Sequence, residues 1–281
     1  GAISLQGMKL TGFRQFGVPW GGPFDSRSAR LANALVGNDV DLPVLEVAMG
    51  ALVLRCEADT LVAVTGAPSA MQLNSGMQAM DCTVCLSRGD ILAIPPAHTG
   101  CRTYLAACGG LSGIPVPGEV LYCKGSSRNR SRTLAQPSFN SRATGLAAMT
   151  GPEIGLFDRE RFELMHFTAS HAMDRRGIRL TGVVPGSRAL DRVEFERPSD
   201  PACPGLVQVT GAGEPIVLGP DGPTIGGYPR IAVLASAEIG RLAQLRPGDS
   251  LTFKFVAAAE AIALRTEAQQ LLEDTIEALR V

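Results

Sequence analysis

Short runs of apolar residues separated by turn-forming residues dominate the chain. Clusters of Gly, Pro, Asn and Asp interrupt these runs at intervals typical of β-sandwiches and β-barrels, and not of alternating βαβ units. The predicted strands cover residues 51–55, 60–65, 90–94, 102–107, 206–209, 215–218, 231–234 and 250–256. The pattern therefore predicts a mainly β fold.

Two segments depart from this pattern and show helical spacing. The first, DSRSARLANALVGN, begins with a capping residue, Asp25 or Ser26, and carries an apolar stripe. It ends at Gly37, a residue type that suits the position after a helix. The second covers residues 257–279, where leucine and isoleucine recur at helical spacing among Glu, Gln and Arg. We expect this tail to pack along a barrel or a partner.

The middle of the chain, residues 113–150, lacks clear periodicity. It is rich in Ser, Arg and Asn, a composition typical of a long loop or a connector between subdomains. The segment divides the chain into halves, 1–112 and 151–256, which are followed by the helical tail 257–281. The halves share no clear sequence repeat. We predict a single unit made of two subdomains.

Composition and charge exclude several classes of protein. The 281 residues are 45% apolar and 19% charged, which is ordinary for a folded globular chain. A net charge of −1 gives no overall field for nucleic acid or an anionic membrane. No apolar run reaches the roughly 18 residues that span a bilayer, and no segment resembles a signal peptide. We therefore expect a cytoplasmic protein that binds neither nucleic acid nor membrane.

The motifs of common catalytic classes are missing. The string CKGSSRNR around Lys124 lacks the spacing of a phosphate-binding P-loop, and neither GxGxxG nor GxSxG appears in its usual setting. The histidines are scattered. Cys82 and Cys85 form a CxxC that is either half of a zinc site or a redox pair, with no second pair to complete it. We expect no bound metal and interpret the seven cysteines as thiols.

Polar residues gather in two segments of the N-terminal half. The Gly/Pro turn GVPWGGPF leads into the first helix, with Asp25 and Asn33, and then to Glu46 in an apolar strand, where a carboxylate needs a partner. In a purely structural interpretation, Asp25 caps the helix, Asn33 bonds turn backbone and Glu46 pairs with an arginine. The second segment, RTYLAACGGL, places Arg102 and Tyr104 before paired glycines at a strand end.

The C-terminal half contains DRRGIRLTG and then the unusual stretch QVTGAGEPIVLGPDGPTIGGYPRI. Glycine permits close backbone approach and proline fixes φ, so this stretch specifies a chain path that few other residues would fit. Such a path is typical of tight turns or of a site. Its polar residues are Gln208, Asp221, Thr224 and Tyr228.

Taken together, the polar segments resemble the allophanate hydrolase subunit 2 family, also called the biotin-dependent carboxyltransferase family. Its members include the C subunit of 5-oxoprolinase and the matching part of urea carboxylase. The resemblance spans nearly the whole chain and rests, in the family's order, on GVPWGGPFD, SARLANALVGN, LEVAMG, VTGA, RTYLAACGG, DRRGIRLTG, GLVQVTGAGEPIVL, PDGPTIGGYPRIA and LAQLRPGD. It implies cyclophilin-like β-barrel subdomains.

The resemblance also implies a function. It favours a subunit of an ATP-dependent amide-processing enzyme, a 5-oxoprolinase that opens 5-oxoproline to glutamate and is active only as a complex. The implied partners are a subunit 1 protein, similar to the B subunit of 5-oxoprolinase, and a third protein similar to its A subunit. One alternative is the carboxyltransferase component of a urea-type carboxylase, which needs biotin carried by a partner. Another is a non-catalytic regulator that binds a kinase-inhibitor-like homologue of subunit 1.

The implied chemistry indicates which residue types the site needs. A cyclic amide is a poor electrophile, and phosphorylating its oxygen makes a leaving group, so the site needs polar groups for the ring and donors for developing charge. We predict catalytic roles for Gln208, Asp221 and Tyr228, with acid and base unassigned. The predicted substrate-binding residues are Asp25, Asn33, Arg102, Tyr104, Arg179, Thr224, Gly226 and Gly227.

Two segments depart from the family's pattern. Family members usually begin with Gln-Asp-x-Gly-Arg-x-Gly, whereas residues 6–12 read QGMKLTG and lack both the acid and the arginine. Residues 121–145, which include LYCKGSSRN and AQPSFNSRATG, also differ. If either segment touches substrate, the chain acts on a different substrate or is a paralogue with little activity of its own.

Overall fold

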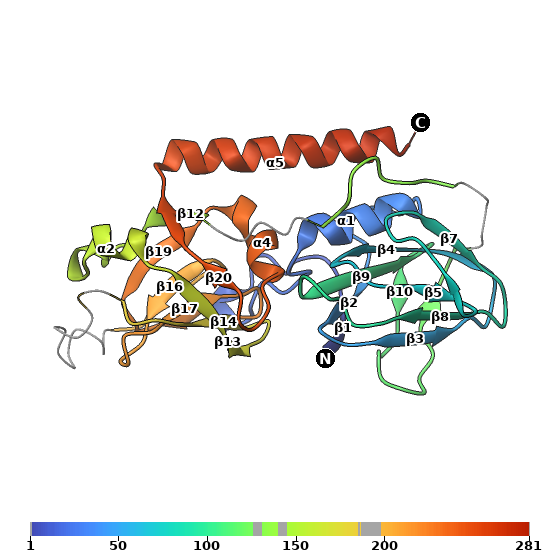
Figure 1. Ribbon diagram of the computed structural model, residues 1–281, viewed down its shortest axis with the longest axis horizontal. Coiled ribbons are helices and arrows are strands. Elements are labelled where there is room, and N and C mark those ends of the chain that lie inside the picture. Colours follow the sequence, from blue (N-terminus) through green and yellow to red (C-terminus); the bar gives the residue numbers. More distant parts are fainter. Residues whose placement is uncertain (1, 126–130, 140–144, 185, 187–197, 281) are drawn as a thin grey trace. The chain divides into compact units, whose positions relative to one another are not determined.

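A computed structural model describes residues 2–125, 131–139, 145–184, 186 and 198–280 (Figure 1). The chain divides into two compact units. Unit 1 comprises Gly1–Met8, Asp25–Ser141 and Gln270–Val281, and unit 2 comprises Lys9–Phe24 and Arg142–Gln269. Parts of CKGSSRNR and AQPSFNSRATG, at 126–130 and 140–144, lie outside the described residues. Strands predominate in both units, which confirms the predicted mainly β class.

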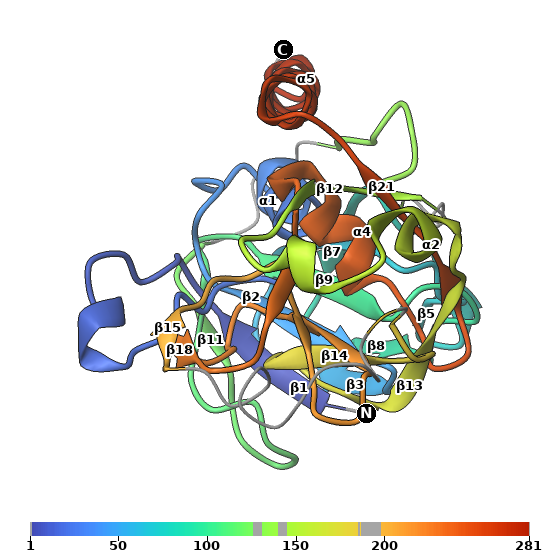
Figure 2. The same cartoon turned by 90° about the vertical axis from the view of Figure 1, so that its left-hand side faces the viewer.

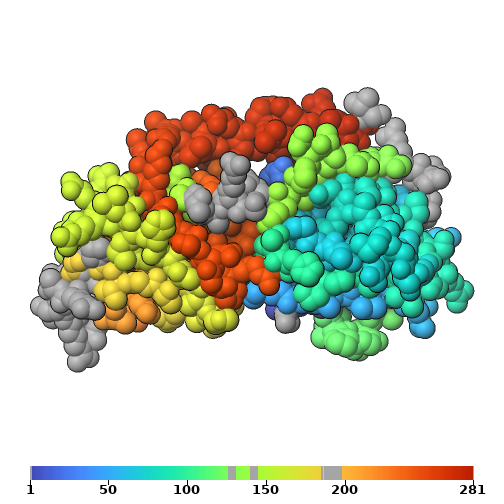
Figure 3. All heavy atoms as spheres, viewed as in Figure 1, coloured from blue at the N-terminus to red at the C-terminus, as the bar shows by residue number. Residues whose placement is uncertain are grey.

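Unit 1 is built on two antiparallel sheets. The five-stranded sheet has the order β1 (Ala2–Gln6), β2 (Val44–Ala48), β9 (Arg102–Ala107), β4 (Thr60–Gly66) and β7 (Thr83–Leu86). The four-stranded sheet has the order β3 (Leu52–Arg55), β8 (Ile91–Ile94), β5 (Gln72–Leu73) and β6 (Gly76–Met77). A small hairpin, β10 (Leu111–Ser112) with β11 (Tyr122–Cys123), carries a loop that protrudes from this unit (Figure 3).

Every residue of strand β9 is buried. Because side chains alternate along a strand, the two faces of β9 contribute to two different apolar clusters. Leu105 packs in one apolar cluster with Leu45 and Val64, whereas Tyr104 belongs to a second cluster with Leu31 of the first helix. That helix, α1 (Ser26–Leu35), begins after Asp25, whose side chain accepts a hydrogen bond from the Ser28 amide. The predicted helix and its cap are confirmed.

The second predicted helix is also confirmed, as α5 (Ala258–Ala278). In unit 1, Leu272 and Ile276 of α5 pack in the apolar cluster of α1. In unit 2, Ala261 and Leu264 pack against Ala147. No helix of the described ranges is both long and apolar enough to cross a membrane.

Unit 2 contains an eight-stranded sheet that nearly closes into a barrel. The strand order is β20 (Ser250–Leu251), β13 (Phe167–Met173), β14 (Gly177–Thr181), β17 (Pro215–Leu218), β16 (Leu206–Val209), β19 (Arg230–Leu234), β12 (Leu146–Thr150) and β21 (Phe253–Phe255). The two edge strands, β20 and β21, are consecutive in the chain, with only Thr252 between them. A single residue therefore links the two edges of the sheet.

The interior of this barrel is apolar and aromatic. Phe162, Phe167 and Phe253 are fully buried with ring centroids 5.2–5.7 Å apart. Val207 and Val209 of β16 point into the same core. Short helices complete the unit: η2 (Ile154–Leu156), α2 (Arg159–Leu164), η4 (Ser236–Glu238) and α4 (Ile239–Ala243).

A two-stranded ribbon lies against the outer face of the barrel. It pairs β15 (Asp200–Pro201) with β18 (Ile225–Gly226) and extends to Ala202, whose amide donates to the Thr224 carbonyl. Ala202 packs on Leu206 and Leu218, which face away from the barrel interior. Figure 2 shows the dark blue segment 9–24, which contains η1 (Arg14–Phe16), beside this ribbon. The ribbon therefore covers the side of β16 that carries Gln208.

Candidate functional site

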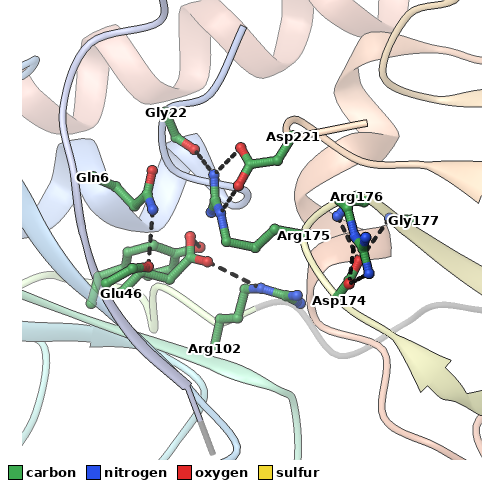
Figure 4. Close-up of polar contacts among 11 residues, drawn as sticks. Gln6, Gly22, Glu46, Arg102, Asp174, Arg175, Arg176, Gly177 and Asp221 are labelled. Atoms are coloured by element: carbon green, nitrogen blue, oxygen red, sulfur yellow. Dashed lines mark hydrogen bonds and ion pairs between the residues drawn. The ribbon is translucent and has the colours of Figure 1, made fainter. Parts of the chain in front are cut away.

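A fully buried polar network joins β2 and β9 in unit 1. The Tyr104 hydroxyl donates to Glu46 Oε2 at 2.9 Å and accepts from the Asp25 amide at 2.8 Å. Arg102 Nε lies 3.4 Å from Glu46 Oε1 (Figure 4). The side chains of Tyr104, Glu46 and Arg102 are at most 2% exposed. Burial first, and then the negative charges of Glu46 and Asp25, hold the pKa of Tyr104 well above its usual range, so Tyr104 remains a neutral donor.

The remaining predicted residues of unit 1 hold α1 and the turn that follows it. Asp25 Oδ1 accepts from the Ser28 amide at 3.1 Å, and Oδ2 accepts from the Ser28 hydroxyl at 2.7 Å. Asn33 is fully buried, donates to the Leu42 carbonyl at 2.8 Å and accepts from Asn38 Nδ2 at 2.8 Å. These bonds match the structural interpretation of both residues. Their participation in substrate binding stays a prediction.

In unit 2, Asp221 is held by a bidentate ion pair. Arg175 Nε donates to Asp221 Oδ2 at 2.7 Å, and Arg175 Nη2 donates to Asp221 Oδ1 at 2.9 Å and to the Gly22 carbonyl at 2.6 Å (Figure 4). Gly219 is needed beside this pair because a Cβ there would collide with the Arg175 carbonyl. The pair fastens the turn at Gly22 to the turn at Asp221. Both Asp221 oxygens accept from one guanidinium, which suits positioning more than proton abstraction.

Gln208 lies beneath the β15–β18 ribbon. Its side chain is 4% exposed, and its Nε2 atom has no hydrogen-bond partner among the described residues. The ribbon approaches so closely that a Cβ at Gly226 would stand 2.6 Å from Nε2. A side chain at 226 would therefore push the carboxamide out of this position. The structure brings together two predicted residues, Gln208 and Gly226. The Gln208 Nε2 donor is buried where they meet.

A second ion pair borders Gln208. Arg230, directly opposite Gln208 in the β16–β19 register, donates to both carboxylate oxygens of Glu153 from Nε at 2.9 Å and from Nη2 at 2.8 Å. Arg230 Nη2 is also 2.9 Å from Asp200 Oδ2 on the ribbon. The hydrogen bonds of Glu153 raise the pKa of Arg230. This guanidinium is thus committed to two carboxylates and ties the ribbon to the barrel.

Arg14, which the sequence analysis did not select, holds the other end of the ribbon. Its Nη2 atom donates to the Ala202 carbonyl and lies 3.4 Å from the Pro223 carbonyl. Its guanidinium carbon stands 5.0 Å from the centroid of the Trp20 ring, a cation–π geometry. Its Nη1 atom is buried, and nothing in the described ranges accepts a hydrogen bond from it. In the sequence, the string GFRQFG, which has a glycine at each end, was the feature that could have drawn attention to Arg14.

The other predicted residues of unit 2 are more exposed. Tyr228 is 45% exposed and follows the ribbon strand β18. Gly227 and the side chain of Thr224 are half-buried, and the Thr224 carbonyl is used in the ribbon. Arg179 lies exposed on β14, whereas Arg175 of the same motif makes the contact with Asp221.

No metal-ligating cluster of three or more His, Cys, Asp or Glu side chains occurs in the part of the chain that the structure describes. Cys82 is half-buried, and Cys85 is exposed on the edge strand β7. Burial raises the pKa of the Cys82 thiol. This thiol is therefore a weaker nucleophile than an activated cysteine.

Comparisons with known proteins agree with one another. A family model described as "Carboxyltransferase domain, subdomain A and B" matches residues 16–119 and 116–255. The chain is 32% identical to the C subunit of 5-oxoprolinase from Escherichia coli, over 93% of this chain and 91% of that protein. It is 28% identical to urea amidolyase of Lachancea kluyveri, over 95% of this chain but 17% of that protein.

A solved structure shows the same fold in a larger protein. The crystal structure of the K. lactis urea amidolyase superposes with a TM-score of 0.85 at 27% identity. The match covers 97% of this chain and 19% of that one. The chain thus corresponds to one part of the amidolyases and to most of the length of the E. coli protein.

Proposed function

Because the chain belongs to the carboxyltransferase domain family, we propose that it is a subunit of an ATP-dependent enzyme that opens 5-oxoproline to glutamate. Its similarity to the C subunit of 5-oxoprolinase over nearly the full length of both chains carries this proposal. Under it, the chain acts beside a subunit 1 protein similar to the B subunit of that enzyme and a third protein similar to its A subunit. ATP is used by the complex, and no metal is assigned to this chain.

The residues of unit 2 suit a small cyclic amide. Opening the ring requires donors that hold the amide oxygen as negative charge develops on it. The Gln208 carboxamide is a neutral donor in a buried setting, where such a bond is stronger than in water. Arg14 supplies positive charge in the same unit, whereas the charge of Arg175 is paired with Asp221. Asp221 positions Arg175, and Tyr228 is accessible to a ligand.

The proposal is tested by reconstitution. The chain is co-expressed with candidate partners of the B and A types, the complex is purified, and glutamate release from 5-oxoproline is measured with and without ATP. We expect ATP-dependent release that disappears when this chain is left out. A stable complex of all three proteins that releases no glutamate contradicts the proposal.

A second candidate is the carboxyltransferase component of a urea-type carboxylase, which the likeness to the K. lactis amidolyase favours. That reaction needs biotin on a partner protein. Carboxyl transfer from a carboxylated biotin carrier to urea, measured with the purified chain, separates it from the first candidate. A complex that forms but performs neither reaction favours a third candidate, a non-catalytic regulator that binds a homologue of subunit 1. The loss of the family's acid and arginine from residues 6–12 also favours this candidate.

A further inference from the structure

Two buried donor atoms flank the β15–β18 ribbon without an acceptor. They are Arg14 Nη1 and Gln208 Nε2, and neither has a partner in the described part of the chain. Burying a donor without an acceptor costs about 1–3 kcal/mol, and more for a charged group. Buried donors of this kind are usually completed by ordered water, an ion or a ligand, or belong to a functional site.

Both atoms adjoin the same apolar layer. Arg14 bonds the carbonyl of Ala202, which packs on Leu206. Leu206 and Gln208 are two residues apart on β16 and so point to the same side of the strand. Arg14 Nη2 lies 3.4 Å from the Pro223 carbonyl and Gln208 lies under Gly226, three residues on, so at most roughly 10 Å of extended chain separates these two contact points. A small ring with a hydrogen bond of about 2.9 Å at each end has a length of this order.

The type of atom determines the class of ligand. The guanidinium of Arg14 is always charged and only donates, so its partner is an anionic or carbonyl oxygen. The carboxylates nearby are already occupied, because Glu153 and Asp200 both pair with Arg230. We propose that the ribbon binds a small carboxylate, whose anionic oxygen accepts from Arg14 Nη1 and whose carbonyl accepts from Gln208 Nε2.

The surroundings of the two donors fit such a ligand. Ile225 and Tyr228 are exposed at and just after β18 and offer apolar surface to a ring. Gly226 lets the carboxamide keep its position against the ribbon, since a side chain there would displace it. The anion site does not depend on the proposed function. Identifying its carboxylate with that of 5-oxoproline does rest on that function.

The single tryptophan provides a direct assay. Trp20 lies under the Arg14 guanidinium, so an anion bound at Arg14 alters its fluorescence. The full-length chain is titrated with 5-oxoproline, glutamate and malonate, and with 2-pyrrolidinone, which has the cyclic amide but no carboxylate. We expect saturable binding of at least one carboxylate and binding of 2-pyrrolidinone weaker by about tenfold or more. No saturable binding of any of the three carboxylates at millimolar concentration overturns the proposal.

Substitutions at Arg14 and Gln208 test whether each donor binds the carboxylate. Binding is measured by calorimetry, because substitutions of Arg14 also change the surroundings of Trp20. Arg14→Gln and Gln208→Leu are each expected to weaken carboxylate binding about tenfold or more. Arg161→Gln is the matched control, since Arg161 is an exposed arginine of the same unit. Unchanged affinity in either Arg14→Gln or Gln208→Leu contradicts the proposal.

A stability measurement separates a binding role from a structural one. Leucine at 208 removes a buried donor that lacks a partner and adds to an apolar layer, so Gln208→Leu is expected to raise the melting temperature while binding is lost. A lower melting temperature would show that the carboxamide is structural and would overturn the assignment. Carboxylate binding without glutamate release from the complete complex refutes the proposed function alone.

Discussion

Tyr104→Phe removes one oxygen from the buried network of unit 1 and leaves the ring in place. Glu46 then loses the hydroxyl donor at 2.9 Å, and the Asp25 amide loses its acceptor at 2.8 Å. A hydrogen bond to a buried charged group contributes about 1.5–3 kcal/mol, and an unsatisfied buried amide costs about 1–3 kcal/mol. We expect a loss of about 3 kcal/mol, which lowers the melting temperature by roughly 10 °C for a chain of this size.

The same substitution has a predicted pH dependence. The pKa of Tyr104 in the folded protein is well above the value of 10.0 expected for the unfolded chain, because burial disfavours the phenolate. The folded state therefore keeps a proton that the unfolded state releases above that pH. Stability from this group is fully present below pH 10 and falls as the pH rises further. The difference between the wild type and Tyr104→Phe is expected to shrink above pH 10.

Urea unfolding at several pH values, followed by circular dichroism, measures both effects. Tyr122→Phe is the matched control, since Tyr122 is 64% exposed in the same unit. Tyrosinate absorbance adds an independent check, because the Tyr104 component should appear only with unfolding. Equal stability of Tyr104→Phe and the wild type at pH 8 would refute this reasoning, as would a stability difference that stays constant from pH 8 to pH 11.

Three further substitutions test other contacts, each by urea denaturation. Glu153→Ala leaves the Arg230 guanidinium without its bidentate partner and is expected to cost about 3 kcal/mol; a cost below about 1 kcal/mol would contradict a stabilising pair. Asp25→Ala removes the cap of α1 and is expected to cost about 1–2 kcal/mol, whereas Asp25→Asn should recover most of it. Asp221→Asn weakens the partly exposed pair with Arg175 by about 1 kcal/mol; a loss that does not diminish in high salt would argue against an ionic contribution.

The sequence predicted those strands whose residue types favour β structure by themselves. The predictions at 102–107, 206–209 and 215–218 coincide with β9, β16 and β17. Three strands of the barrel, β12, β13 and β14, were missed. Two of them, LAAMT and FTASHAM, are rich in alanine, which has low β propensity, so pairing with neighbours distant in the chain decides their conformation.

The candidate site was predicted in part for a similar reason. Gln208 and Gly226 stood out as a polar residue and a glycine in a stretch with a constrained path. Arg175 did not, because its partner Asp221 is 46 residues away and nothing local distinguishes it from Arg179. The role of Arg14 was still harder to predict from the sequence, since its contacts with Ala202 and Pro223 span 188 and 209 residues.

The one-residue link at Thr252 has a consequence for synthesis of the protein. The strands that it joins, β20 and β21, pair with β13 and β12, so a nascent chain that ends before residue 250 presents both of those strands as open edges. Open edges invite pairing with other chains. The barrel can close only after residues 250–255 have left the ribosome. Truncation shortly before Ser250 should therefore yield a chain that aggregates or recruits chaperones, even though most of the barrel sequence is present.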